Sequence, residues 1–220
     1  MVQTERPQRE RASAFTVLEL LVVLGIIAIM LVALVPAVTS LSKAGGRRAA
    51  LNSLLGGIEQ ARAEAIKSGQ PTYVVFPTFT SGAQSTLDRY NYRSYAIFEI
   101  DPATGVAKQL TDWKSFPAGV ALRAAGTAAL SNLADPATLI PPVTFSFTPD
   151  TSATPFRCLK FNSNGEVQTP AANVLLAVFE GYVYNGSEVA TTKDGSGNPS
   201  AVEYVMVSQF TGRAEPTAAP

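Results

Sequence analysis

The longest apolar stretch of the chain runs from Phe15 to Val38, and only Thr16 and Glu19 interrupt it with polar side chains. At about 1.5 Å of rise per residue, a helix of this length spans the roughly 30 Å hydrocarbon core of a bilayer. We therefore predict that residues 15–38 form a membrane-inserted helix. The polar residues 1–14 carry more arginine than glutamate, which favours a cytoplasmic N-terminus.

The following segment, residues 39–68, keeps a helical pattern with one apolar face. Apolar or small residues recur about three or four positions apart, at Leu41, Ala44, Leu51, Leu54, Leu55, Ile58, Ala61, Ala65 and Ile66. This spacing is typical of an amphipathic helix that packs on a globular domain. Gly69 followed by Pro71 is a helix stop signal. We therefore predict one helix from Phe15 to about Ser68, with residues 39–68 as its amphipathic continuation.

Two glycine pairs, Gly45-Gly46 and Gly56-Gly57, weaken this helix by roughly 1 kcal/mol per glycine. One interpretation is a stem that bends or locally melts when it is packed into an assembly. The other is close packing of the helix on the globular domain, where a larger side chain would clash. For Gly56-Gly57 we favour close packing.

From Thr72 onward the pattern changes to short runs rich in β-branched and aromatic residues. The predicted strands are 72–79, 92–100, 106–110, 143–147, 156–161, 173–184 and 202–210. Turn sequences such as "DPATG", "NSNG" and "DGSGNP" separate them. This spacing predicts a two-sheet or strongly bent antiparallel β-domain over residues 69–212 that packs on the helix. The predicted fold class is therefore α+β.

Two segments do not follow the strand pattern. Residues 121–142 are rich in alanine, leucine and proline, and we interpret them as a loop insertion in the β-domain. The C-terminal residues 213–220, "RAEPTAAP", are expected to be a disordered tail.

The composition excludes several classes of function. Lysine plus arginine and aspartate plus glutamate both number 17, so the net charge of zero gives no reason to expect nucleic acid as a partner. The chain has no histidine, which removes the commonest general base and metal ligand. The single cysteine, Cys158, excludes an intrachain disulfide and a multi-cysteine metal site. We therefore predict no catalytic residues, no metal site and no cofactor.

Four weaker candidates also have a structural interpretation. The loop "DGSGNP" begins like a calcium loop at Asp194, but Pro199 and Val205 stand where such a loop needs Gly and Glu. Cys158 lies in a strand and is interpreted as a structural thiol. "NGS" at 185–187 fits a glycan acceptor or a hairpin turn. The aromatic residues could form a sugar- or DNA-binding face, but their alternation favours the core: Tyr73, Phe76, Phe79, Tyr90, Tyr92, Tyr95, Phe98, Trp113 and Phe116.

The boundary between Ala14 and Phe15 resembles a known processing site. "SAFTVLELLVVLGIIAIMLVALVP" is similar to the class III leader of type IV prepilins and type II secretion pseudopilins. The resemblance implies that residues 1–14 are a leader, that prepilin peptidase cuts between Ala14 and Phe15, and that the new amine of Phe15 is methylated. Ala14 stands where the family usually has glycine. Pro36 matches the family's proline at the end of the first apolar stretch, and we expect a helix kink there.

Glu19 occupies the position of the family's glutamate. A lone carboxylate inside a bilayer costs roughly 2.5 to 3.5 kcal/mol, so such residues usually have a partner. The resemblance implies that, in a filament, Glu19 pairs with the amine of Phe15 of a neighbouring subunit and sets the register of assembly. The alternative is a carboxylate at the headgroup level of a plain membrane anchor.

The later part of the chain, with "ARAEAIKSGQPTYVVFP", "FNSNGEV" and "VMVSQFTGR", resembles minor pseudopilins of the GspH kind and FimT-like minor pilins. This implies a subunit of a bacterial pseudopilus or pilus, held in the inner membrane with its C-terminal domain in the periplasm. The implied partners are prepilin peptidase, the assembly platform, other pilin subunits and the lipid bilayer. The alternative functions are a membrane-tethered periplasmic binding domain, for sugar or DNA, that does not polymerise, and an anchored hydrolase, which the absence of histidine disfavours.

Overall fold

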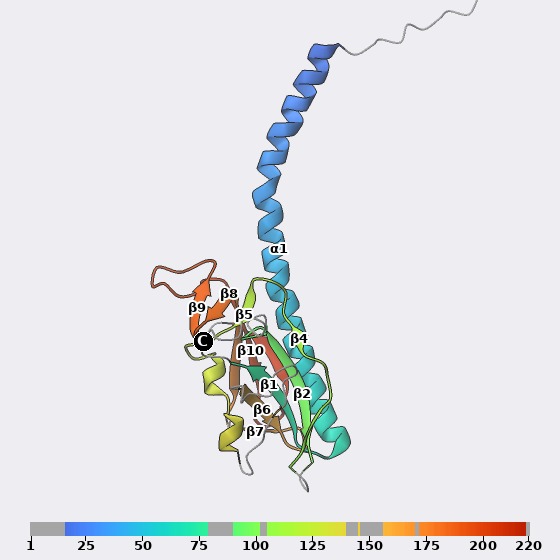
Figure 1. Cartoon of the computed structure of the whole chain (residues 1–220), viewed down its shortest axis with the longest axis vertical. Coiled ribbons are helices and arrows are strands. Elements are labelled where there is room, and N and C mark those ends of the chain that lie inside the picture. Colours follow the sequence, from blue (N-terminus) through green and yellow to red (C-terminus); the bar gives the residue numbers. More distant parts are fainter. Residues whose placement is uncertain are drawn as a thin grey trace, which may run out of the picture. The chain divides into compact units, whose positions relative to one another are not determined.

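The chain divides into two units, Met1–Ser42 and Lys43–Pro220. A computed structural model describes residues 16–78, 90–101, 105–139, 145, 156–169 and 172–218, with the backbone alone for residues 33–44 and 169. Figure 1 shows the elements of the second unit, which contains both β-sheets.

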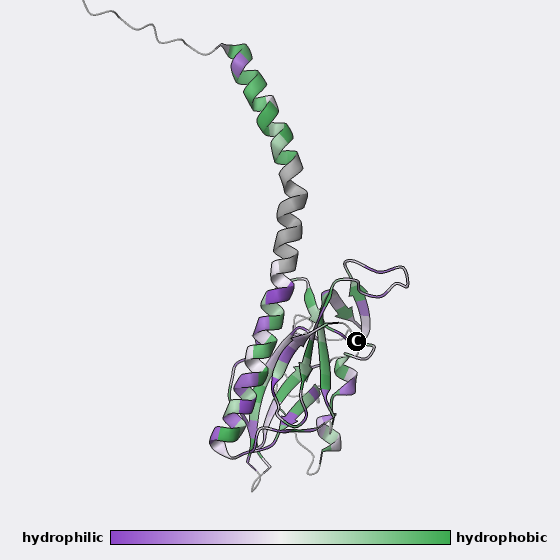
Figure 2. Ribbon diagram, turned by 180° about the vertical axis from the view of Figure 1, so that it is seen from behind, coloured by the Kyte–Doolittle hydropathy of each residue, from purple (hydrophilic) through white to green (hydrophobic). Residues whose placement is uncertain are grey.

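The helix α1 spans Val17–Ser68 and confirms the single long helix expected from the sequence. It ends as predicted, because Gly69 adopts the left-handed conformation with φ of 69° and its N–H donates to the carbonyl of Ala65 at 3.0 Å. Figure 2 shows the difference in hydropathy along it: the described first turns are mostly apolar, with one hydrophilic position near their start, whereas the last turns alternate between polar and apolar residues.

The first sheet has the order β3-β2-β1-β6-β7, and β4 also pairs with β2. These strands are β1 (Thr72–Pro77), β2 (Ser94–Ile100), β3 (Ala107–Gln109), β4 (Lys114–Ser115), β6 (Phe156–Phe161) and β7 (Val167–Thr169). The second sheet has the order β11-β10-β8-β5, and β9 also pairs with β8. Its strands are β5 (Val120–Leu122), β8 (Val174–Tyr184), β9 (Ser187–Ala190), β10 (Val202–Val207) and β11 (Ala214–Thr217).

Every described strand pairing is antiparallel, which confirms the two-sheet, α+β interpretation. Two short 3-10 helices, η1 (Leu130–Asn132) and η2 (Pro136–Thr138), connect β5 with the segment before β6.

Two hydrophobic clusters lie on opposite faces of the first sheet. β1 is buried along its whole length because its alternate side chains enter different clusters. Val74 and Phe76 join the main core between α1 and the two sheets. Tyr73 and Val75 join a second, aromatic-rich cluster with Phe98 and others. The helix contributes to the main core with one face: Ala50, Leu51, Leu54, Ile58, Ala61 and Ala65.

The glycine pair at 56–57 combines one crowded and one open position. A Cβ on Gly57 would lie 2.6 Å from Cζ and 2.7 Å from the hydroxyl oxygen of Tyr95, so only glycine lets α1 approach β2 this closely. A Cβ on Gly56 would meet no atom within 4 Å. The close-packing interpretation is thus confirmed for Gly57 and is wrong for Gly56.

Two predictions about the end and the middle of the β-domain need correction. The expected disordered tail contains β11, which pairs with β10 from Ala214↔Val207 to Thr217↔Tyr204. The expected loop insertion 121–142 begins inside β5, whose three residues are fully or almost fully buried and pair with β8. The strand expected at 143–147 falls outside the described residues, except for Phe145, which is buried.

Candidate functional site

The carboxylate of Glu19 closes the first turn of α1. Its Oε2 accepts hydrogen bonds from the backbone N–H and the hydroxyl group of Thr16, both at 3.2 Å. The backbone N–H of Glu19 donates to Oγ1 of Thr16, also at 3.2 Å. This reciprocal arrangement is a capping box, in which two otherwise unpaired helix N–H groups find acceptors. A negative charge also interacts favourably with the positive end of the helix dipole.

Sequence reasoning found Glu19 but missed Thr16 as its partner. The signal was present, since the sequence T-x-x-E before an apolar run is typical of a capping box. The structure therefore shows a local role for Glu19 that does not require a second subunit.

Downstream of this cap, α1 exposes an apolar surface. All large apolar side chains from Val17 to Val32 are at least 47% exposed, and Glu19 is the only carboxylate among them. Surfaces of this kind normally mark a site that a membrane or another protein covers. No helix in the described part of the chain is long and apolar enough to cross a membrane.

The other residues predicted for this site remain untested. Ala14 and Phe15 lie outside the described residues. Pro36 lies within the helical backbone of α1, but its side chain is not among those described, and the expected kink stays a prediction.

Arg47 lies in the part of α1 that belongs to the second unit, residues 43–68, and contacts two strands of the second sheet. Its Nη1 donates to Oε2 of Glu180 on β8 at 3.0 Å, and its Nε lies 3.7 Å from Oε1 of Glu203 on β10. Both side chains of the shorter pair are largely buried, with 18% and 8% exposed. A buried carboxylate of this kind depends on a nearby cation.

Toward the C-terminal end of α1, two side chains form hydrogen bonds with the C-terminal segment of the chain. Oε1 of Glu59 accepts a hydrogen bond from the N–H of Ala214 at 2.9 Å, and Nε of Arg62 donates to the carbonyl of Thr211 at 2.6 Å. The turn residue Gly212 packs here with φ of 63°, and an added Cβ would lie 3.2 Å from Cδ of Arg62. These contacts explain why residues after 213 are ordered as β11.

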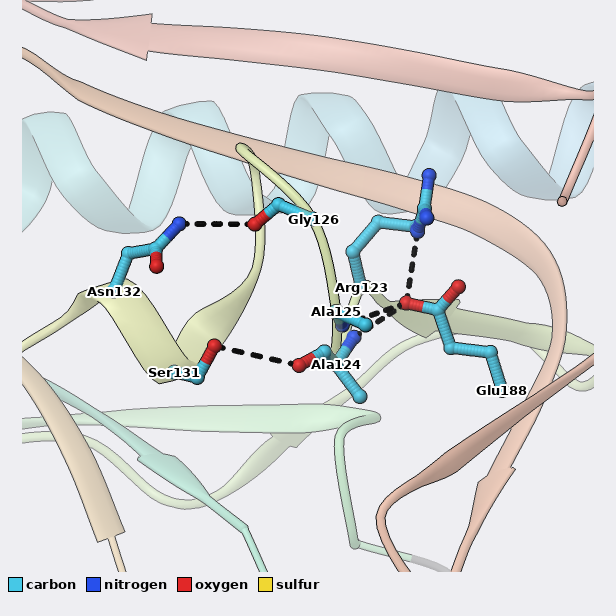
Figure 3. A network of polar contacts seen from close by, with 7 residues as sticks. All are labelled: Arg123, Ala124, Ala125, Gly126, Ser131, Asn132 and Glu188. Atoms are coloured by element: carbon cyan, nitrogen blue, oxygen red, sulfur yellow. Dashed lines mark hydrogen bonds and ion pairs between the residues drawn. The ribbon is translucent and has the colours of Figure 1, made fainter.

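Glu188 on β9 forms a second polar network, shown in Figure 3. Its Oε1 accepts from Nε of Arg123 at 2.8 Å and from the N–H groups of Ala124 and Ala125 at 2.7 and 2.9 Å. The segment after β5 is thereby tied to the β8–β9 hairpin. This carboxylate is 10% exposed, and its Oε1 accepts three hydrogen bonds that hold the local structure.

The weaker candidate sites have structural roles in the described residues. Oδ1 of Asp194 accepts from the N–H groups of Ser196 and Asn198, both at 2.9 Å, so the "DGSGNP" loop is held by a local turn. No cluster of acidic, cysteine or histidine residues that could hold a metal occurs in the parts that the structure describes. Cys158 is buried, and burial raises the pKa of its thiol to about 12.

The aromatic residues lie mostly in the two cores. The buried members of the set are Tyr73, Phe76, Tyr92, Tyr95, Phe98 and Phe116, whereas Tyr90 and Trp113 are partly buried. Phe79 lies outside the described residues. The core interpretation is confirmed for the buried members.

The comparison with family models decides the family. The model described as "Type II transport protein GspH" matches residues 50–181, more than half of the chain. The chain belongs to the GspH family. The part matched to GspH begins in α1 and ends in β8, so it includes Gly57 and Glu59, whereas the capping box and Arg47 precede it.

Two solved structures are similar to this GspH-family chain in fold. The type IV minor pilin FimU of Pseudomonas aeruginosa (strain PAO1) has 14% sequence identity and a TM-score of 0.41, covering 81% of this chain and 92% of FimU. The minor pseudopilin EpsH from the type 2 secretion system of Vibrio cholerae has 13% identity and a TM-score of 0.40, covering 78% of this chain and 96% of EpsH. None of the curated proteins matches the chain.

Proposed function

We propose that this chain is a minor pseudopilin or minor pilin, a structural subunit of a type II secretion pseudopilus or a type IV pilus that carries out no catalysis. In this proposal prepilin peptidase removes residues 1–14 by cutting between Ala14 and Phe15, and the new amine of Phe15 is methylated. Residues 15–38 then hold the subunit in the bacterial inner membrane, with the β-domain in the periplasm, until the assembly platform adds the subunit to the filament.

One observation carries this proposal: a single carboxylate, Glu19, stands at the start of a helix whose large apolar side chains are all exposed from Val17 to Val32. An apolar helical surface of this extent requires a cover, and a bilayer or a bundle of identical helices supplies one. A purely hydrophobic anchor has no need of Glu19, because the residue costs insertion free energy. Membership of the GspH family supports a pilin-like subunit as the context.

In this proposal Glu19 has one partner in the isolated subunit and another in the filament. In the isolated subunit its carboxylate accepts from the N–H and hydroxyl of Thr16. After cleavage, the amine of Phe15 is a cation close to the same helix start. In the filament we propose that the amine of a neighbouring subunit's Phe15 forms an ion pair with this carboxylate in place of Thr16. The donors of Thr16 are neutral groups, whereas the amine is a cation, so the exchange adds the attraction of two opposite charges in a medium of low dielectric constant and favours assembly.

Glu19→Leu in the native host tests this function. We expect the variant to be cleaved and to remain in the membrane fraction, but to be absent from filaments sheared from the cells. Glu64→Leu is the matched control, because Glu64 is a carboxylate on the same helix whose described partner is the exposed Lys67. Normal incorporation of Glu19→Leu would contradict the role proposed for Glu19, whereas absence of the parent chain from the filaments would favour the tethered binding domain that does not polymerise.

A further inference from the structure

The outer edge of β5 is already used by other parts of the chain. The N–H of Leu122 points away from β8 and donates to the carbonyl of Tyr92 at 2.7 Å. The N–H of Val120 points the same way and donates to the carbonyl of Pro117 at 3.3 Å. β5 therefore has no free N–H group with which to bind a further strand.

The outer edge of β11 is closed in a different way. The N–H of Ala214 points away from β10 and donates to the carboxylate of Glu59 on α1 at 2.9 Å. The next residue of β11 with this orientation is Pro216, which has no N–H group. Proline on the edge and cover by a neighbouring helix are ways in which proteins protect sheet edges from association. β11 thus offers a further strand no N–H group either.

The strand β9, in contrast, keeps free hydrogen-bonding groups along its outer edge. The N–H of Thr191, just after β9, donates to the carbonyl of Glu180 on β8 at 2.9 Å. Because backbone groups alternate in direction along a strand, the N–H and C=O groups of Glu188 and Ala190 point away from β8. In the part of the chain that the structure describes, neither of these N–H groups donates to an acceptor. β9 can therefore pair with one more strand.

The side chains beside this edge are apolar and exposed. Tyr182 and Tyr184 are 51% and 56% exposed, and Val189, the partner of Tyr182, is 37% exposed. They lie on one face of the hairpin, because alternate side chains of a strand share a face. Glu188 directs its carboxylate to the other face, where Arg123 and two backbone N–H groups bind it (Figure 3). The edge thus combines free backbone groups with exposed apolar side chains, as a contact surface does.

The edge of β9 is complementary to itself. When two copies of β9 lie antiparallel about a two-fold axis at Val189, Glu188 of each copy faces Ala190 of the other. Both residues direct their N–H and C=O groups outward, so each of these pairs can exchange hydrogen bonds in both directions. The Val189 side chains meet at the axis, and no like charges lie opposite each other. The apolar faces of the two copies then lie on the same side of one continuous sheet.

The outer strand β3 of the first sheet lacks this complementarity. The N–H of Asp101 donates to the carbonyl of Val106 at 3.2 Å. Alternation therefore directs the backbone groups of Ala107 and Gln109 away from β2. The same two-fold pairing at this edge would set the exposed Lys108 opposite Lys108 of the second copy, and like charges in this position are destabilising. Of the edges compared, β9 is the one suited to a second copy of this chain.

We propose that β9 pairs with β9 of a second copy of this chain, in the antiparallel two-fold register centred on Val189. The contact joins the two hairpins into one sheet with the order β8-β9-β9-β8. It is short, so the dimer is expected to be weak and to form at high local concentration. A two-fold contact closes on itself and does not extend a filament. It is therefore a contact beyond that of the proposed function, and it does not depend on Glu19.

Cysteine crosslinking of the full chain in native host membranes tests this pairing. Val189→Cys places two thiols directly opposite, with Cβ atoms about 4.5 to 5.5 Å apart, close to the separation that a disulfide needs. Ser187→Cys places them about 14 Å apart along the strands, out of reach. We expect mild oxidation to give a covalent dimer with Val189→Cys and at least several-fold less with Ser187→Cys. The parent chain, whose Cys158 is buried, gives the background.

A mixed sample fixes the register and allows variants of the edge to be compared. In the proposed pairing Ser187 lies opposite Thr191 of the second copy, so chains with Ser187→Cys and chains with Thr191→Cys should form a mixed disulfide when they are expressed together. Ala190→Pro removes one outward N–H, as Pro216 does on β11, and Val189→Lys sets like charges opposite each other. We expect each change to lower the yield of mixed dimer several-fold.

Phe210→Lys is the matched control for Val189→Lys, because it adds the same charge at a 76% exposed position between β10 and β11 and should leave the yield unchanged. Absence of a Val189→Cys dimer, equal crosslinking of Val189→Cys and Ser187→Cys, or a mixed-dimer yield that the edge variants do not change would overturn the pairing. A Val189→Cys chain that crosslinks to another protein and not to its own copy would assign the edge to a different partner and overturn it as well. None of these results bears on the proposed function, which the incorporation of Glu19→Leu tests separately.

Discussion

The side chains of Thr16 and Glu19 cap α1 reciprocally: each accepts a hydrogen bond from the backbone N–H of the other at 3.2 Å. The residue proposed to set the register of a filament is therefore already engaged within its own subunit. The helix cap and the proposed contact between subunits use the same carboxylate of Glu19. Variants of Thr16 and of Glu19 distinguish the two roles.

Thr16→Val keeps the shape of the side chain but removes the hydroxyl group of the cap. We expect it to weaken the first turn of α1 by about 1 kcal/mol, as the loss of an N-cap does, while incorporation into filaments persists. Amide hydrogen exchange of the first turn and the subunit content of sheared filaments measure the two effects. Loss of incorporation equal to that of Glu19→Leu would show that Glu19 acts through the cap.

Gly57→Ala and Gly56→Ala form a matched pair on one helix. A methyl group at 57 would overlap the ring of Tyr95, whereas at 56 it would meet open space. We expect Gly57→Ala to lower the free energy of unfolding by about 1 to 3 kcal/mol and Gly56→Ala to raise it by up to about 1 kcal/mol. Urea unfolding of the full chain in detergent compares them, and equal effects would be inconsistent with the close contact between α1 and β2.

Arg47→Ala removes the cation beside Glu180. Because this carboxylate is only 8% exposed, we expect a loss of about 3 kcal/mol in the free energy of unfolding. Arg48→Ala, at an exposed neighbouring position, is the control and should cost little. In the double variant Arg47→Ala, Glu180→Gln the loss should be smaller than the sum of the two single losses; strict additivity would mean that the pair is not coupled.

The stability of the β-domain should fall in alkaline solution. Burial raises the pKa of the Tyr73 hydroxyl from its ordinary 10.0 to about 12, and burial followed by the charge of Asp135 raises the pKa of Cys158 from 9.0 to about 12. Both groups hold their protons more tightly when folded, so their contribution is complete below pH 9 and is lost between about pH 9 and 12. Burial lowers the pKa of Lys160, which opposes this trend in part.

Urea unfolding at a series of pH values between 8 and 12 measures this loss. The variant Tyr73→Phe, Cys158→Ala should show a flatter decline than the parent chain, whatever its stability at neutral pH. An identical decline in the two proteins would assign the alkaline transition to other groups.

The parts of the fold predicted from the sequence are those that local pattern determines. β6 has the predicted bounds Phe156–Phe161, because its short apolar run is buried on both faces of the strand, with the adjacent Cys158 and Leu159 both buried. The hairpin turn at Asn185-Gly186 is also confirmed, with φ of 47° and 73°, since this pair readily adopts the left-handed conformation.

The missed parts depend on distant residues. β11 has the sequence AEPT, which has low strand propensity, and it forms through pairing with β10 and through the carboxylate of Glu59. The contact of Arg47 with Glu180 joins residues that lie far apart in the chain, so no local sequence pattern predicts it. The capping box is the exception, because its signal, T-x-x-E, is local.

The N-terminal peptide mass of the protein from native host membranes tests the central claim most directly. We predict a chain that begins at Phe15 and is heavier by one methyl group on its amine, since processing there creates the cation that Glu19 is proposed to bind. A chain that still begins at Met1, or one that is cut near residue 40, would contradict the account.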